Sequence, residues 1–367
     1  MENSERILYR ISASEILTEC CHRLRLESWR LPAYFHPKAS SAASVRLILL
    51  LHVVSPLKAF YSDHFVLPLP AGHRFPMQKY RLIHEGALAT VADIEFHEAP
   101  TTSDGVLALA HHPRYIADVS NGTLSDSVQK AIGFPWTPQM VERSRRSAGA
   151  TIAACRAAIT TPDRIAVNLA GGTHHAFADQ GGGFCVFNDA AIAARLMQAE
   201  RLVQRVAIVD LDVHQGNGTA SILANDDSVF TLSLHGAHNY PFDKECSDLD
   251  VALPDGTGDD AYLEALQQAL QQMMQRFAPQ LIIFLAGADP HEGDRLGRLK
   301  LSFDGLARRD AMVLATAGRH AIPVAVAMAG GYGKNIQDTV AIHLQTISLA
   351  AHHARQQRAA QPLTQPG

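Results

Sequence analysis

RVAIVDLDVHQGNG, residues 205–218, combines a nearly continuous apolar run with regularly spaced polar side chains. The apolar run, residues 205–211, is typical of a strand that is buried on both faces of a parallel sheet. Asp210, Asp212 and His214 alternate with apolar residues at its end, and alternate side chains of a strand point to the same side. The stretch therefore predicts a buried strand whose end presents these three side chains to one cavity.

The same pattern recurs along the chain, with each short apolar run followed by a longer segment of Ala, Leu, Gln, Glu and Arg. It predicts strands at residues 164–169, 205–211, 229–234, 281–286 and 323–329. It predicts helices at residues 138–158, 189–201, 259–277, 302–318 and 336–356. Alternation of strands with helices is typical of α/β proteins, so we expect one large α/β domain.

Polar, glycine-rich loops follow all of the predicted strands. They read AGGTHH at 170–175, DVHQGNG at 212–218, HGAHNY at 235–240, GADPHEGD at 287–294 and AGGYG at 329–333. In open α/β sheets, ligands bind beyond the carboxyl ends of the strands, where such loops converge. The sequence therefore predicts one site, built from these loops.

Asp212, His214 and Asp289 are the candidate metal ligands. Two carboxylates and an imidazole suit zinc and leave coordination positions open for water and substrate. In the alternative interpretation, Asp210 and Asp212 only cap the next helix and His214 only packs. The gathering of His, Asp and Tyr at the other strand ends favours the metal site.

Two further loops carry candidate catalytic groups. His174 and His175 follow two glycines and are acid–base candidates, although neighbours in an extended chain face opposite ways and a single working histidine is the alternative. Tyr332, between glycines in residues 330–333, can present a hydrogen-bond donor to a developing oxyanion.

The composition narrows the class of protein. Among 367 residues, 47% are hydrophobic and 19% charged, which is typical of a globular chain, and the net charge of −4 shows no basic footprint for direct nucleic-acid binding. Five cysteines without C-x-x-C spacing indicate a reducing compartment, and no apolar run is long enough for a membrane span, so we expect a cytoplasmic protein.

With these loops assembled, the chain resembles the zinc-dependent histone deacetylase family, most closely its bacterial and class IV-like members. The stretches that carry the resemblance are FYSDHFVLPLPAGHRFPMQKY from Phe60, GGTHHAFADQGGGFCVFND from Gly171, DLDVHQGNGT from Asp210, GADPHEGDRLG from Gly287 and AGGYG from Ala329. The resemblance implies an arginase/deacetylase-like fold, a three-layer αβα sandwich with a mostly parallel central sheet. It covers a catalytic domain at residues 58–356, which leaves an N-terminal extension at 1–57 and a tail at 357–367 that we expect to be disordered.

The resemblance also implies roles for individual residues. One Zn²⁺ is assigned to Asp212, His214 and Asp289, with Asp210 orienting His174. A structural K⁺ would be enclosed by the backbone of Asp210, Asp212 and His214 and by Ser233 and Leu234. Lysine-tunnel positions fall on Gly183, Phe184 and Tyr240, and an arginine of an inner acetate channel falls on Arg74.

The sequence departs from the family's pattern at two places. Gln215 follows the zinc-bound histidine, and Asn217 stands where some relatives have an aspartate that pairs with the second histidine, so His175 has a neutral partner. An amide cannot raise the pKa of a histidine as a carboxylate does. A counterpart of the rim aspartate that holds the substrate backbone in some members is not evident.

We therefore expect a hydrolase that cleaves the amide of N-acetyl-lysine with a metal-activated water. His175 would act as general base and acid, His174 would support it, and Tyr332 would stabilise the oxyanion. The alternatives are an acetylpolyamine or other small-molecule amidohydrolase, a long-chain lysine deacylase, and a non-enzymatic acyl-lysine binder. A binuclear ureohydrolase of the same fold is disfavoured because Gly216 replaces the aspartate that its second metal needs.

Overall fold

The computed structural model describes residues 56–360, and residues 1–55 and 361–367 lie outside the described part. Its centre is an eight-stranded sheet in the order β2-β1-β3-β8-β7-β4-β5-β6, in which all neighbours are parallel. The strands are β1 (Leu57–Tyr61), β2 (Ile94–Glu98), β3 (Ile165–Asn168), β4 (Val206–Asp210), β5 (Val229–Gly236), β6 (Leu249–Leu253), β7 (Leu281–Leu285) and β8 (Val324–Ala327).

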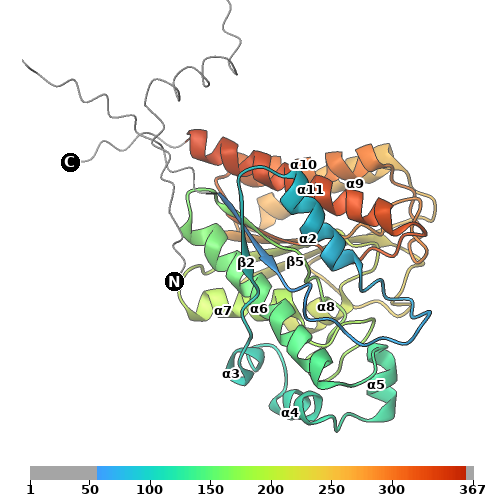
Figure 1. Cartoon of the computed structure of the whole chain (residues 1–367). Coiled ribbons are helices and arrows are strands. Elements are labelled where there is room, and N and C mark those ends of the chain that lie inside the picture. The colour runs from blue at the N-terminus through green and yellow to red at the C-terminus, as the bar shows by residue number, and fades with distance from the viewer. Residues whose placement is uncertain (1–55, 361–367) are drawn as a thin grey trace, which may run out of the picture. The chain divides into compact units, whose positions relative to one another are not determined.

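Helices cover both faces of this sheet (Figure 1), with α2, α9, α10 and α11 on one face and α6 and α7 on the other. The helices are α2 (Lys79–Thr90), α3 (Asp104–Leu107), α4 (Pro113–Asn121), α5 (Asp126–Ile132), α6 (Pro138–Thr160), α7 (Asp189–Ala199), α8 (Asn217–Leu223), α9 (Asp259–Arg276), α10 (Phe303–Arg319) and α11 (Ile336–Ala360). The predicted three-layer αβα sandwich is confirmed. Within residues 56–360, no helix combines the length and apolar character that crossing a membrane requires.

The sheet is buried on both faces, as β4 shows. Val206 and Ile208 belong to the core on the side of α6 and α7, whereas Ala207 and Val209 belong to the core on the opposite side. A strand in this position needs apolar residues at every position, which explains the unbroken apolar runs. The predicted strands and helices are all present, with ends that differ by at most four residues.

The sequence did not predict the outer strands β2 and β6, the strand β1, or the helices α2–α5 and α8. The outer strands β2 and β6 alternate half-buried with exposed positions over much of their length, so their apolar signal is weak. β1 begins at Leu57, the last residue of the proposed extension, and α11 continues to Ala360, inside the proposed tail; the domain boundaries themselves stay predictions. The rest of both segments, except Pro56, lies outside the described residues.

One fully buried arginine connects α10 to the strand ends. Nη1 of Arg309 donates to the carbonyls of Leu211 at 3.2 Å and Gly287 at 2.6 Å, and Nε donates to Asp310 at 2.8 Å. Thr346 on α11 donates to the other Asp310 oxygen at 2.6 Å. Since Leu211 follows β4 directly and Gly287 lies two residues after the end of β7, this network holds the loops after both strands.

Replacing Arg309 by Met should lower the free energy of unfolding by about 3–5 kcal/mol, because it leaves the buried Asp310 carboxylate without its cation. Urea denaturation measures the change. The matched control is Arg308→Met on the same helix, where the exposed side chain forms only surface ion pairs that contribute about 0–1 kcal/mol. Equal losses in the two variants would contradict this account of Arg309.

Candidate metal centre

The chain turns where β4 ends. The Asp212 N–H donates to Asp210 Oδ1 at 3.2 Å, and the His214 N–H donates to Asp212 Oδ1 at 3.0 Å. Such local bonds from a carboxylate to the amide two residues on are typical of turns. The prediction that the strand alternation extends to His214 is therefore wrong. The alternative, that these aspartates cap the next helix, also fails, because α8 has Gly216 as its N-cap and no side-chain cap.

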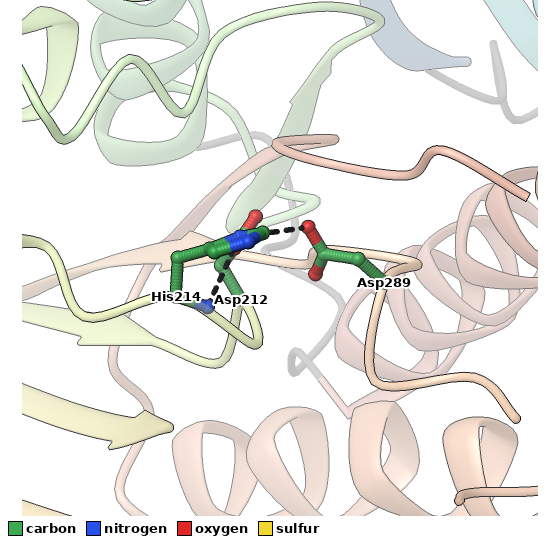
Figure 2. A group of neighbouring side chains, drawn as sticks. All are labelled: Asp212, His214 and Asp289. Atoms are coloured by element: carbon green, nitrogen blue, oxygen red, sulfur yellow. Dashed lines mark hydrogen bonds and ion pairs between the residues drawn. The ribbon is translucent and has the colours of Figure 1, made fainter. Parts of the chain in front are cut away.

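Asp212, His214 and Asp289 nevertheless converge, as predicted (Figure 2). One ligand atom from each lies within 4.8 Å of the others, and all three side chains are buried. His214 Nδ1 is 2.9 Å from Asp212 Oδ1 and 3.3 Å from Asp289 Oδ2. Asp289 Oδ2 accepts no well-formed hydrogen bond although it is buried, which is the expected state of an oxygen that serves a cation. The donor set fits a divalent metal such as zinc.

Glycines allow the backbone to approach these ligands. A Cβ at Gly330 would lie 2.0 Å from Asp289 Oδ2, and one at Gly287 would lie 2.7 Å from Asp212 Oδ2. The Gly330 N–H donates to Asp212 Oδ2 at 2.8 Å, which uses the close approach to orient a ligand. Any other residue at position 330 would overlap the cluster.

The charges of the cluster need compensation in the protein without metal. Burial raises the pKa of Asp289, and the neighbouring Asp212 charge raises it further, to about 7. Burial opposes a charge on His214, but the two carboxylates outweigh it and raise its pKa to about 10. A protonated His214 thus places a positive charge beside both carboxylates and donates its hydrogen bond to Asp212 Oδ1.

His174 and His175 lie side by side with ring centroids 4.1 Å apart, and both line the cavity. His174 Nδ1 is 2.6 Å from Asp210 Oδ2, and His175 Nδ1 is 2.7 Å from Asn217 Oδ1, which are the pairings expected from the sequence. The loop is not extended here, so the alternative in which adjacent histidines face opposite ways does not apply.

The two partners give the histidines different charge states. Burial lowers the pKa of His174, but the Asp210 and Asp212 carboxylates outweigh burial and raise it to about 9. Burial also lowers the pKa of His175, and positive neighbours at His174 and His214 lower it further, well below the usual value. At neutral pH, His174 is therefore positively charged and His175 is neutral.

Asp189 supports the histidine loop and was missed by the sequence reasoning. Its carboxylate accepts from the backbone N–H of Gly172 at 2.9 Å and of Thr173 at 2.7 Å, and from the Thr151 hydroxyl at 2.6 Å. As the first residue of a helix, it gives no sequence signal that separates it from an ordinary first-turn acid.

Tyr332 is fixed by its backbone and by packing. Its N–H donates to Asp294 Oδ2 at 2.6 Å, and its carbonyl accepts from Arg295 Nε at 2.9 Å. Its ring centroid lies 5.9 Å from that of Phe184. Burial raises the pKa of the phenol well above its usual value, so Tyr332 stays protonated and can donate a hydrogen bond.

One cavity of about 680 Å³ contains Asp212, His214, both histidines of the pair and Tyr332. The predicted tunnel residues Gly183, Phe184, Tyr240 and Arg74 also line it. Gly183 is needed for space, because a Cβ there would lie 2.5 Å from the His175 ring. Their contact with a substrate stays a prediction.

Arg74 does not lie deep in the cavity wall, as the inner-channel role requires, because its side chain is exposed. The buried guanidinium is that of Arg143, whose central carbon lies 4.5 Å from the centroid of the Tyr80 ring. Arg143 lies in the Arg-rich helix α6, and the sequence alone does not distinguish it from its neighbours.

The residues predicted to enclose potassium are close together, since Asp210 pairs with Ser233 in adjacent strands. Asp210, Ser233 and Leu234 are all buried. The Ser233 hydroxyl is 2.9 Å from His235 Nδ1 and so already has a protein partner. These contacts give no independent support for the ion, and potassium stays a prediction.

Comparison with known proteins identifies the family. Residues 73–347 match the histone deacetylase domain. An uncharacterized protein of Picosynechococcus sp. is 43% identical, covering 77% of this chain and 94% of its own, and a histone deacetylase-like amidohydrolase of Pseudomonas aeruginosa is 35% identical, covering 73% and 74%. The crystal structure of a histone deacetylase homologue from Aquifex aeolicus has the same fold, with a TM-score of 0.70 and 20% sequence identity. The match covers 83% of this chain and 89% of the homologue. The chain therefore belongs to the histone deacetylase family, whose deacetylases and amidohydrolases cleave amide bonds.

Proposed function

We propose that the protein is a zinc-dependent deacetylase that hydrolyses the amide of N-acetyl-lysine in a protein or peptide. One observation carries the proposal. The cluster of Asp212, His214 and Asp289 lies at the same cavity as Tyr332 and the histidine pair, whose two rings differ in charge. Zinc held by these ligands would polarise the amide carbonyl and lower the pKa of a bound water.

His175 is suited to move the proton. Because Asn217 Oδ1 accepts a hydrogen bond, Nδ1 of a neutral His175 carries the hydrogen and Nε2 is left as the acceptor. Nε2 can take a proton from the attacking water and then deliver it to the leaving amine. His174, held positive by Asp210, would stabilise the negative charge that develops next to it.

Tyr332 would donate to the oxyanion. Its ring forms part of the cavity wall, and the loop that carries it is tied to the metal site by the bond from Gly330 to Asp212. A donor that is already oriented does not have to reorganise as charge develops on the carbonyl oxygen.

A single metal fits the site better than the binuclear ureohydrolase arrangement. Within residues 56–360, Asp212, His214 and Asp289 form the one group of side chains that could hold a metal. Gly216 leaves no carboxylate for a bridge to a second ion, and a Cβ at this position would lie 2.4 Å from Asp210 Oδ2.

The charges at the cavity favour acyl-lysine in a peptide over an acetylated polyamine. Among the described residues that line the cavity, Asp212 is the one carboxylate, whereas Arg74 and Lys130 are exposed cations. A polycation would be repelled by this surface. The name of the Pseudomonas aeruginosa relative, a histone deacetylase-like amidohydrolase, keeps an amide other than that of acetyl-lysine as a second candidate.

Replacing Asp289 by Asn should reduce bound zinc from about one ion per chain to less than about 0.1 ion per chain, because a neutral amide is a poor ligand for zinc. Turnover should fall by at least about 10²-fold. Metal analysis by mass spectrometry and an assay before and after chelation measure both. Asp304→Asn, on the exposed face of α10, is the control and should keep its metal. Two manganese ions per active chain would contradict the proposal.

Replacing Tyr332 by Phe should lower kcat by about 10²–10³-fold with a small change in KM, since the lost hydrogen bond forms in the transition state. Steady-state kinetics on a fluorogenic acetyl-lysine peptide measure it. Tyr61→Phe, at the end of β1 and outside the cavity lining, controls for the loss of a phenol. An unchanged kcat would remove Tyr332 from the mechanism.

An acetyl-lysine peptide with acidic flanking residues should have a kcat/KM about 10-fold above that of an acetylated polyamine, and salt should reduce the difference. Competition assays at low and high ionic strength test this. The double variant Lys130→Ala with Arg74→Ala should narrow the preference. A preference for the polyamine would show that the surface cations do not select the substrate.

A further inference from the structure

Lys79 has an unusual position for a lysine. It is the first residue of α2, and its side chain is buried, with 1% of the residue exposed. Burial is costly for an ammonium group, and the positive end of the helix dipole adds to the cost. No carboxylate among residues 56–360 forms an ion pair with Lys79, and the one hydrogen bond of its side chain in this range runs from Nζ to the Ala329 carbonyl at 3.0 Å.

The group that Lys79 holds is the start of the loop that carries Tyr332. Ala329 has a left-handed backbone with φ of 54°, which is an uncommon conformation for alanine. It also packs against Gly172, where an added Cβ would lie 2.4 Å from that of Ala329. The hydrogen bond from Lys79 thus fixes a strained residue three positions before Tyr332.

The same ammonium lies close to the rings of two tyrosines. Nζ is 5.2 Å from the ring centroid of Tyr80 and 5.7 Å from that of Tyr332, within the range of a cation–π contact. A positive charge at the ring draws electron density from the phenol and makes its O–H a stronger hydrogen-bond donor. Lys79 is absent from the cavity lining, so it acts from behind the loop and does not contact substrate.

We propose that Lys79 is a positioning residue for the reaction, which holds the loop from Ala329 to Tyr332 in place and strengthens the phenol of Tyr332 as an oxyanion donor. The inference rests on the proposed function, because it requires Tyr332 to act in turnover. Lys79 sets the orientation and the donor strength of this phenol, and the cost of its burial is explained by that role.

The test is a double-mutant cycle of Lys79→Met with Tyr332→Phe. Alone, Lys79→Met should lower kcat by about 10- to 100-fold with KM changed less than about twofold, because the lost effect belongs to the transition state. In the Tyr332→Phe background, the same change should cost less than about threefold, because its target is gone. Lys300→Met, at an exposed lysine, is the control and should be neutral.

The outcomes separate the two proposals. If Tyr332→Phe leaves kcat unchanged, Tyr332 has no role and both the mechanism and the role of Lys79 fail. If Tyr332→Phe is slow but Lys79→Met costs the same factor in both backgrounds, or leaves kcat unchanged, only the role of Lys79 fails. Zinc content and thermal unfolding verify that each variant is folded and loaded.

If turnover in Tyr332→Phe is too low to measure, a spectroscopic measurement replaces the double-mutant cycle. If Lys79→Met does not fold, Lys79→Gln takes its place. 3-Fluorotyrosine placed at position 332 reports the phenol's surroundings by ¹⁹F NMR. Loss of the Lys79 charge should move this resonance, whereas Lys300→Met should not. If the resonance has the same chemical shift in the Lys79 variant as in the protein with Lys79 intact, the proposal is overturned.

Discussion

The site depends on one electrostatic constraint, the burial of Asp212 and Asp289 side by side. Two carboxylates in a low-dielectric interior repel each other unless a positive charge lies between them. A protonated His214 lies within ion-pair distance of both carboxylates, and a divalent ion held by the three residues would supply a positive charge in the same way. Arg309 holds the loops that carry the two carboxylates, through the carbonyls of Leu211 and Gly287, and the Gly330 N–H donates to Asp212.

The site also contains two histidines that are adjacent in the chain and differ in charge. His174 and His175 are adjacent and equally buried, yet Asp210 holds one positive and Asn217 leaves the other neutral. Burial disfavours a charge on both rings, so the Asp210 carboxylate makes the difference for His174, and the positive charge on His174 helps to keep His175 neutral. The all-parallel sheet brings these residues together. Its strands β3, β4, β7 and β8 end at the same edge, so loops that are far apart in sequence line one cavity.

Two cations near the cavity are buried and have no carboxylate partner among residues 56–360. Lys79 bonds a backbone carbonyl, and Arg143 stacks on aromatic rings. Polarisable rings and carbonyl dipoles stabilise such buried cations. The sequence motifs do not reveal either of these buried cations.

The sequence alone determined the buried strands, the helices between them and the three side chains that could hold a metal, because apolar runs and glycine-rich loops are local signals. It also gave the pairing of His174 with Asp210 and of His175 with Asn217, through the family resemblance. Only the tertiary structure revealed the turn after Asp210, the exposure of Arg74 and the burial of Arg143, Lys79 and Arg309. Those features depend on which element lies against a side chain, and a lysine or arginine in a helix has the same sequence signal whether solvent or a packed loop covers it.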